Sequence, residues 1–339
     1  MRKFYVGLLA LFVLLALGAC SGKSGEDQKK QDEAKGKKLE KVTVMLDWYP
    51  NAVHSYLYAA KEKGYFADEG LDVEFKFPAN PTDPLSLAAS GNVTMGMYYQ
   101  PDVIMARANE NIPVKAVAAV VRSPLNHLVF KADAGIKSPK DLEGKKVGYS
   151  GVPVAESMIK TMVEDDGGDY GKVKMVDVGF DLIPALVSGN TDAVTGMYIN
   201  HEVPILKSEG HKVKDINPGD YGVPSYYELV AVTSDATWDK QQKEIEAFWR
   251  AADKGFEFMD QHPKDALKIL LDNQDKSNFP LDEKIETESM EILLPKMRSD
   301  QGFGSQEAAS WDDTGKWLKD AGLIQEIPAS EDLFINIKK

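Results

Sequence analysis

The feature that most constrains the fold is an alternation of short apolar segments with longer amphipathic ones, which begins at Val42. Such an alternation is typical of a mostly parallel β-sheet whose faces are covered by helices. Up to residue 121 it predicts strands at 42–46, 71–77, 93–97 and 114–121, and helices at 54–64, 84–90 and 101–109.

A second set of the same elements follows Ser138-Pro139, which is a helix-start signal. This set predicts strands at 147–149, 173–178, 192–197 and 211–216, and helices at 155–164, 181–188 and 201–208. After residue 232 the pattern is largely helical, with helices predicted at 239–261, 263–272, 282–296 and 305–321.

Two segments connect the sets: residues 127–130 lead out and residues 228–232 return. One continuous large sheet is an alternative architecture. We favour two α/β lobes because the two segments flank a self-contained set of elements. Lobe I is then formed by residues 41–126 and 233–339, and lobe II by residues 127–232 with both crossover strands. Two crossovers of this kind form a cleft that can close about a hinge.

The charge balance argues against one class of partner. The chain has 53 acidic and 40 basic residues, which gives a formal net charge of −13. Residues 1–19 hold Arg2 and Lys3 and no acid, so the remainder carries −13 − 2 = −15. Nucleic-acid binding needs clustered basic groups, and we therefore expect no nucleic-acid partner.

The N-terminal residues have the pattern of a secretory signal peptide. Arg2 and Lys3 precede an apolar run at 6–16, which is followed by Leu17-Gly-Ala and Cys20. A membrane anchor is the alternative, but this run is short for a bilayer core of about 30 Å. We predict a signal peptide at residues 1–19 and an extracytoplasmic protein.

Cys20 is the only cysteine in the chain, which excludes an internal disulfide. Its position after Leu17-Gly-Ala resembles the bacterial lipobox, in which the cysteine receives a diacylglyceryl group. Residues 21–40 have almost no apolar side chains and predict a disordered tether. A flexible tether of this length reaches roughly 25 Å. We therefore expect a lipid anchor on Cys20 that attaches the protein to the cell membrane.

Polar and aromatic side chains are concentrated where the first strand ends. Asp47, Trp48, Asn51 and His54 lie together in a stretch that also contains Tyr49 and Pro50. Open α/β sheets bind ligands at the carboxyl ends of their strands, so we take these four as candidate ligand contacts. Each has a structural alternative: Trp48 as a core residue, Asp47 and Asn51 as helix caps, and His54 as a surface residue.

Further candidates follow other predicted strands. Tyr98 and Tyr99 end the strand at 93–97, where packing in the core is the alternative. Backbone amides at a helix entrance suit an anion or a carbonyl oxygen, although an acid there also favours the helix dipole. The remaining candidates follow the second-lobe strands or the returning crossover: Ser150, Gly151, Glu156, Asn200, Glu202, Tyr226 and Tyr227. Glu228 lies beside Tyr226 and Tyr227 at the returning crossover, where these three residues are placed to close the cleft.

Several of these stretches resemble one family of proteins. The matching segments are 46–54 (LDWYPNAVH), 64–71 (GYFADEGL), 78–83 (PANPTD), 142–149 (LEGKKVGY) and 178–186 (VGFDLIPAL). They are similar to the solute-binding proteins of ABC importers, in the branch that includes ThiY and the pyrimidine synthases of yeast. The resemblance runs from about residue 42 to residue 322.

The resemblance implies a fold and a function. The fold is the two-lobed periplasmic-binding-protein fold, and the function is capture of a thiamine-related pyrimidine, such as an N-formyl aminomethylpyrimidine, for an ABC permease. Asn200 and Glu202 match the position where ThiY-like proteins hold the aminopyrimidine edge. We expect a monomer without catalytic residues or a cofactor. We also expect no metal, because the sequence has no metal-ligand spacing.

Two departures bear on the alternatives. The yeast-type enzymes carry a cysteine-rich run in the returning crossover, where residues 224–229 read PSYYEL. Their Gly-Glu-Phe-Gly phosphate loop is replaced by Gly151-Val-Pro-Val. Both changes argue against the alternative hypothesis that the protein is a pyridoxal-phosphate enzyme of the pyrimidine synthase type. A binding protein for another solute, such as riboflavin or an alkylsulfonate, is a further alternative.

The lipobox interpretation makes a direct prediction. Replacing Cys20 by Ala removes the only site for the acyl chains, while the expected cleft lies in residues 42–339. Cys20→Ala should therefore stay folded and bind ligand but leave the membrane fraction, as measured by fractionation and immunoblotting. A variant that still sediments with membranes contradicts the lipid anchor.

Overall fold

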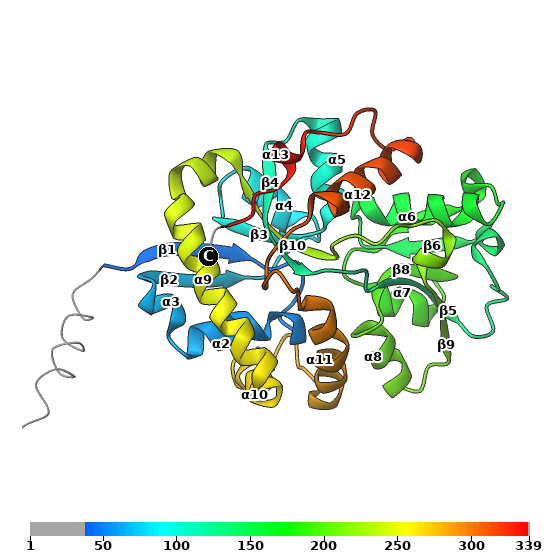
Figure 1. Ribbon diagram of the computed structural model, residues 1–339. Helices are drawn as coiled ribbons and strands as arrows, with labels where there is room; N and C mark the ends of the chain where they lie inside the picture. Colours follow the sequence, from blue (N-terminus) through cyan, green and yellow to red (C-terminus); the bar gives the residue numbers. More distant parts are fainter. Residues whose placement is uncertain (1–37, 338–339) are drawn as a thin grey trace, which may run out of the picture. The chain divides into compact units, whose positions relative to one another are not determined.

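The computed structural model describes residues 38–337 and contains two β-sheets (Figure 1). The first sheet contains the earliest strand of the described residues. The strand order is β2-β1-β3-β10-β4. β1 pairs in parallel with β2 and β3, whereas β10 lies antiparallel between β3 and β4. The strands are β1 (Glu40–Met45), β2 (Leu71–Lys76), β3 (Met95–Tyr98), β4 (Val114–Val121) and β10 (Leu229–Ser234).

The second sheet is built in the same way from the middle of the chain. Its order is β7-β6-β8-β5-β9, with β6 parallel to β7 and β8, and β5 antiparallel to β8 and β9. The strands are β5 (Asn126–Lys131), β6 (Lys146–Tyr149), β7 (Lys174–Asp177), β8 (Ala193–Tyr198) and β9 (Val213–Ile216). Each sheet therefore contains one antiparallel strand next to a crossover.

Helices cover both sheets (Figure 1). Those that follow strands of the first sheet are α2 (Ser55–Glu62), α3 (Tyr65–Asp68), α4 (Asp83–Ala89) and α5 (Gln100–Glu110). The second sheet is followed by α6 (Pro153–Asp165), α7 (Leu182–Ser188) and α8 (Glu202–Ser208). The C-terminal part contributes α9 (Asp235–Gln261), α10 (Pro263–Asp272), α11 (Glu283–Met297), α12 (Ala308–Asp320) and α13 (Ser330–Leu333).

Two separate sheets confirm the predicted two-lobed α/β fold and exclude the continuous sheet. The chain crosses between the sheets from β4 to β5 and again from β9 to β10. β10 forms its hydrogen bonds within the first sheet, and the lobe boundaries near residues 126 and 232 stay a prediction. The predicted signal peptide and Cys20, the predicted site of the lipid, lie outside the described residues, as does nearly all of the predicted tether.

The predicted start of the helix at 239–261 was wrong, because the observed helix α9 begins earlier, at Asp235. Ser234 caps this helix, since its hydroxyl oxygen accepts a hydrogen bond from the amide of Thr237 at 3.1 Å. The helix predicted at 305–321 starts later, at Ala308. The four-residue helices α3 and α13 were not predicted because they are too short to show a period.

The core of the first lobe forms because the strands are covered on both faces. Val42, Val44 and Leu46 are fully buried, as expected for a central parallel strand. α2 packs against α9, and Gly255 of α9 lies directly over the backbone of Tyr56. In the part of the chain that the structure describes, no helix combines the length and the apolar character needed to cross a membrane.

Gly255 is a position where the packing of two helices can be tested. A Cβ atom there would overlap the carbonyl oxygen of Tyr56 and lie 2.7 Å from Cβ of Ala60. Gly255→Ala should therefore lower the free energy of unfolding by about 1–3 kcal/mol, although alanine is the better helix former. Urea unfolding followed by circular dichroism measures this change. Lys243→Ala, at an exposed position of the same helix, is the control and should change stability little. A Gly255→Ala variant as stable as the control would show that the helices can move apart at low cost.

Candidate functional site

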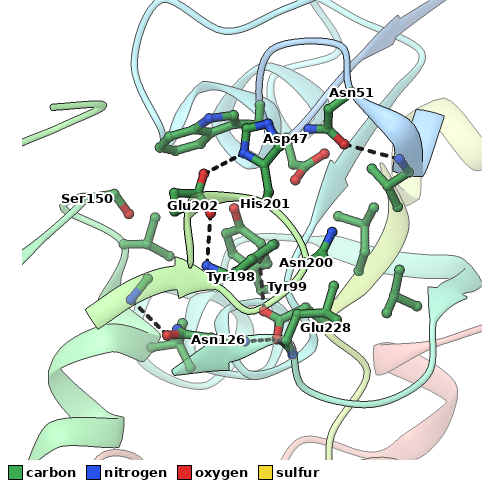
Figure 2. A pocket seen from close by; sticks show the side chains of 18 of the residues that line it. Asp47, Asn51, Tyr99, Asn126, Ser150, Tyr198, Asn200, His201, Glu202 and Glu228 are labelled. Atoms are coloured by element: carbon green, nitrogen blue, oxygen red, sulfur yellow. Dashed lines mark hydrogen bonds and ion pairs between the residues drawn. The ribbon is translucent and has the colours of Figure 1, made fainter. Parts of the chain in front are cut away.

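A pocket lies where the ends of strands from both sheets meet (Figure 2). Asp47 and Trp48 follow β1, Tyr99 follows β3, and Ser150 follows β6. Its wall also includes residues of both crossovers. The complete lining is Asp47, Trp48, Asn51, Val53, Tyr99, Val121, Leu125, Asn126, Ser150, Val152, Val154, Ala155, Gly196, Tyr198, Asn200, His201, Glu202, Glu228 and Leu229.

Seven of the candidates from the sequence line this pocket: Asp47, Trp48, Asn51, Tyr99, Ser150, Asn200 and Glu202. The other six do not line it: His54, Tyr98, Gly151, Glu156, Tyr226 and Tyr227. For all thirteen, contact with a ligand stays a prediction.

The six other candidates have contacts that explain their positions. Tyr226 stacks on Trp317 with ring centroids 6.4 Å apart, and the hydroxyl oxygen of Tyr227 accepts from the amide of Glu307. Tyr98 is buried in the core beside Tyr99. Tyr149 Oη donates to the carboxylate of Glu156 at 2.6 Å, and His54 bonds to Asp47. Gly151 has a positive φ of 75°, and a Cβ atom there would lie 2.8 Å from a carboxylate oxygen of Asp177.

Trp48 is half-buried and lies at the boundary between the lobes. Its ring meets Phe180 edge to face, with centroids 4.4 Å apart and an interplanar angle of 75°. Next to it, Tyr49 stacks on Phe279 at a centroid distance of 3.7 Å. Trp48 therefore belongs to an aromatic group around the pocket and is not a core residue beneath the helix at 54–64.

Local capping fixes the orientation of Asp47. The amide oxygen of Asn51 accepts from the backbone of Val53, and Nδ1 of His54 accepts from the backbone of Asn51 at 3.2 Å. Since Nδ1 is an acceptor, the histidine proton is on Nε2, which donates to Oδ1 of Asp47 at 3.0 Å. A neutral His54 thus holds the Asp47 carboxylate, and Asn51 caps the short 3-10 helix Ala52–His54 that precedes α2.

His201 and Glu202 form a charged pair, partly buried at His201 and buried at Glu202, that continues into the first lobe. Nδ1 of His201 lies 2.9 Å from Glu202, and Nε2 lies 3.6 Å from Glu286 of α11. Burial opposes the charge on the imidazole, but Glu202 and Glu286 together raise the pKa of His201 to about 10. Burial also opposes the charge of Glu202, while His201 and the amide of Tyr198 lower the pKa of that carboxyl group. The pair is therefore ionised at neutral pH.

Asn200 presents an unpaired acceptor. Its side-chain nitrogen donates to the hydroxyl of Ser289 at 2.9 Å, while its Oδ1 is buried and has no hydrogen-bond partner. Buried polar atoms are nearly always paired, so an orphan in a pocket wall is suited to accept from a ligand. Asn200 and His201 both reach α11, so this helix contacts the second lobe on the border of the pocket.

Glu228 lines the pocket, whereas the sequence pointed to it only as part of the returning crossover that closes the cleft and not as a ligand contact. Its Oε2 accepts from the amides of Leu125 at 2.6 Å and Asn126 at 3.1 Å, and its Oε1 accepts from Tyr198 Oη at 3.0 Å. Burial and, more weakly, Asp47 raise the pKa of Glu228, against the effect of these donors. A sequence signal existed: an acid directly before the apolar run of the returning strand.

Asn126, Tyr198 and His201 were also missed. The side-chain oxygen of Asn126 accepts from the amide of Gly196 at 2.7 Å and so connects β5 to β8. Tyr198 and His201 lie close to Asn200 in the sequence, and Asn200 was predicted. The alternation of side chains ends with the strand, so the pattern did not indicate which neighbours of Asn200 face the pocket. Among the described residues no group of three or more metal-binding side chains is present, and no Lys or Arg lines this pocket.

Sequence comparison relates the whole chain to known proteins. The family model described as "NMT1/THI5 like" matches residues 51–266. The formylaminopyrimidine-binding protein of Halalkalibacterium halodurans is 50% identical over 338 residues, which cover 99% of each chain. A putative thiamine biosynthesis protein of Haemophilus influenzae is 31% identical over 300 residues, covering 88% of this chain and 93% of that one.

Comparison with solved structures relates the fold to other binding proteins. The alkanesulfonate-binding protein SsuA from Xanthomonas axonopodis pv. citri, bound to MOPS, matches with a TM-score of 0.69. The match covers 88% of this chain and 99% of that one at 10% sequence identity. Identity this low shows a shared fold and nothing about the ligand.

The charged pair at His201 predicts how stability depends on pH. The folded pKa of about 10 lies above the ordinary value of 6.5, so the protonated imidazole stabilises the fold fully below about pH 6.5. This contribution is lost as pH rises through about 10. His201→Gln should therefore be less stable than wild type by roughly 1–3 kcal/mol at pH 6, and the difference should shrink towards pH 10.

Chemical unfolding of both proteins between pH 6 and pH 10.5 measures the difference. His211→Gln is the matched control, because His211 is more exposed and lies 3.6 Å from a single exposed acid, Glu209. A stability difference for His201→Gln that stays constant over this range would contradict a raised pKa of His201.

Proposed function

Because the chain belongs to the NMT1/THI5-like family, we propose that it is a solute-binding protein that captures a formylaminopyrimidine for an ABC importer. The ligand is a thiamine-related pyrimidine precursor, N-formyl-4-amino-5-aminomethyl-2-methylpyrimidine or a close relative. It occupies the pocket between the strand ends, and closure of the two lobes encloses it without making or breaking a bond.

The observation that carries this proposal is the buried acceptor pair of Asn200 and Glu202. Oδ1 of Asn200 has no partner, and each oxygen of Glu202 accepts one hydrogen bond and can accept a second. An exocyclic amine offers two N–H donors that suit two such acceptors. His201 keeps Glu202 ionised, which makes the acceptor stronger.

Aromatic side chains suit the faces of the pyrimidine ring. Trp48, Tyr99 and Tyr198 all line the pocket. A stacked or edge-to-face aromatic contact adds about 0.5–1.5 kcal/mol beyond the area it buries. We assign the ring to this group of side chains, and the formyl group to the amides and hydroxyl near Ser150 and Gly151, at the entrance of α6.

The other candidates position the residues that contact the ligand. Asn51 and His54 hold Asp47, and Glu156 holds Tyr149 next to the α6 entrance. Tyr98, Tyr226 and Tyr227 pack beside the pocket wall and around the returning crossover.

The cellular setting is part of the same proposal. A signal peptide at residues 1–19 directs export, and a lipid on Cys20 attaches the protein to the membrane through the tether. A monomer placed in this way keeps its cleft within reach of an ABC permease, which receives the pyrimidine when the lobes open.

The alternatives fit the pocket less well. A pyridoxal-phosphate enzyme of the synthase type needs a lysine next to the ligand, whereas no lysine lines this pocket. An alkylsulfonate needs free cationic or amide donors, whereas the one cation of the lining, His201, already faces Glu202 and Glu286, and Asp47 and Glu228 also line the wall. No feature of the lining favours riboflavin.

Calorimetric titration tests the proposal with three ligands: the formylaminopyrimidine, the free aminomethylpyrimidine and an analogue without the ring amine. Wild type should bind the formylated compound, and loss of the amine should weaken binding by at least tenfold, since a buried carboxylate then loses its donor. Glu202→Gln keeps the shape but not the charge and should weaken binding of the formylated compound about tenfold or more.

Glu209→Gln, an exposed position near the end of α8, is the matched control and should bind like wild type. Absence of binding to all three compounds would refute the proposed function. Equal affinity of wild type for all three would refute recognition of the amine at Asn200 and Glu202.

A further inference from the structure

The pocket has more negative than positive charge. Its ionisable lining residues other than tyrosines are Asp47, His201, Glu202 and Glu228. His201 is the only base among them, and it already faces two carboxylates, those of Glu202 and Glu286. One imidazolium between two carboxylates leaves nothing to balance Asp47 or Glu228.

Asp47 and Glu228 are both bonded to neutral donors. Asp47 accepts from Nε2 of a neutral His54. Glu228 accepts from two backbone amides and from the hydroxyl of Tyr198. Only 4% of the surface of Asp47 and 3% of that of Glu228 is exposed, so water does not screen their charges effectively.

Two cations lie on the elements around Glu228, but their bonds go to other groups: Nζ of Lys296 donates to Ser123 and Pro124, and Arg122 lies over the Tyr227 ring and pairs with Glu307. The titratable groups that act on Glu228 come from the end of β1, from β3, α5, β8 and the returning crossover: Asp47, Tyr99, Asp102, Tyr198 and Tyr226. Asp102 is itself fully buried, and one of its carboxylate oxygens has no hydrogen-bond partner. Burial first, and then the neighbouring Asp47, raise the pKa of Glu228. This direction agrees with an uncompensated negative charge.

A positively charged ligand would balance the two carboxylates. The proposed ligand has an amide in place of its side-chain amine, so its formylated arm carries no charge. Its aminopyrimidine ring, however, has a basic ring nitrogen that can accept a proton. Protonation converts that nitrogen from an acceptor into a charged N–H donor. Such a donor matches a carboxylate oxygen and does not match a backbone N–H group.

We propose that the pocket binds its pyrimidine as a cation protonated on a ring nitrogen, whose charge is balanced by the Asp47 and Glu228 carboxylates. This inference rests on the proposed function. The proton comes from solvent and stays on the ligand, so no bond of the protein changes. Above the pKa of the free ligand, each binding event takes up one proton, and Kd rises about tenfold per pH unit.

The test uses wild-type protein and the formylaminopyrimidine. Calorimetric titration at pH 8, in two buffers with different ionisation enthalpies, measures the number of protons taken up. We expect close to one proton per ligand and a Kd that weakens from pH 6 to pH 9. Nitrogen-15 NMR of ring-labelled ligand then shows where the proton is, because a protonated ring nitrogen has a directly bonded hydrogen.

The NMR result shows whether the proton taken up is on the ligand ring or on a carboxylate of the protein. A bound ring nitrogen without a hydrogen, together with proton uptake, means that Glu228 or Asp47 was neutralised instead and overturns the proposal. Tight binding without proton uptake also overturns it, while the proposed function stands. Absence of binding at every pH refutes the proposed function itself, and the proposal with it.

Two variants test which residues balance the charge. Asp47→Asn and Glu228→Gln keep the shape of the side chains and should each weaken binding at pH 6 by about tenfold or more. Glu164→Gln, at an exposed position of α6, is the control and should bind like wild type. Because Glu228 also holds two backbone amides, circular dichroism checks its folding, and Asp47→Asn provides the independent test. Unchanged affinity of a folded Asp47→Asn and a folded Glu228→Gln overturns the proposal.

Discussion

The two lobes depend on how the chain crosses twice between its sheets, and the carboxylate of Glu228 joins the two crossings. It belongs to the returning segment, yet its Oε2 accepts from the amides of Leu125 and Asn126 in the outward segment. A buried carboxylate needs such donors, and amides next to a strand end need acceptors. The same side chain reaches Tyr198 with its other oxygen, so the join between the lobes is also part of the pocket wall.

Several contacts between the lobes beside the pocket are polar, although Trp48 also meets Phe180 edge to face there. α11 of the C-terminal part meets the second lobe through Ser289 and Glu286, and Asp102 of α5 accepts from the amide of Val154 at the start of α6. Polar contacts of this kind cost little when they are exchanged for water, unlike a broad apolar interface. The arrangement therefore suits lobes that separate and close around a small molecule.

The sequence predicted most of the fold because strand and helix periods are local. The alternation from Val42 placed every long element, and the family resemblance drawn from a few segments is confirmed by the family match. Local reasoning failed where two partners meet from distant parts of the chain. Glu228 and His201 owe their environment to Leu125 and Glu286, whose proximity no spacing reveals. Tyr98 and Tyr99 show a second limit, since their ring centroids lie 4.8 Å apart and yet only Tyr99 lines the pocket.

In this pocket the charge of the wall restricts the class of ligand. The sulfonate-binding protein of similar fold shares 10% sequence identity, so few wall residues need be common to both. An anion would face Asp47, Glu202 and Glu228 at close range in a site where little water remains, and each unpaired approach costs energy. The same three acids are favourable only for a ligand that donates hydrogen bonds or carries positive charge. A fold that encloses its ligand thus strengthens both the attraction and the rejection, because closure removes the water that would weaken either.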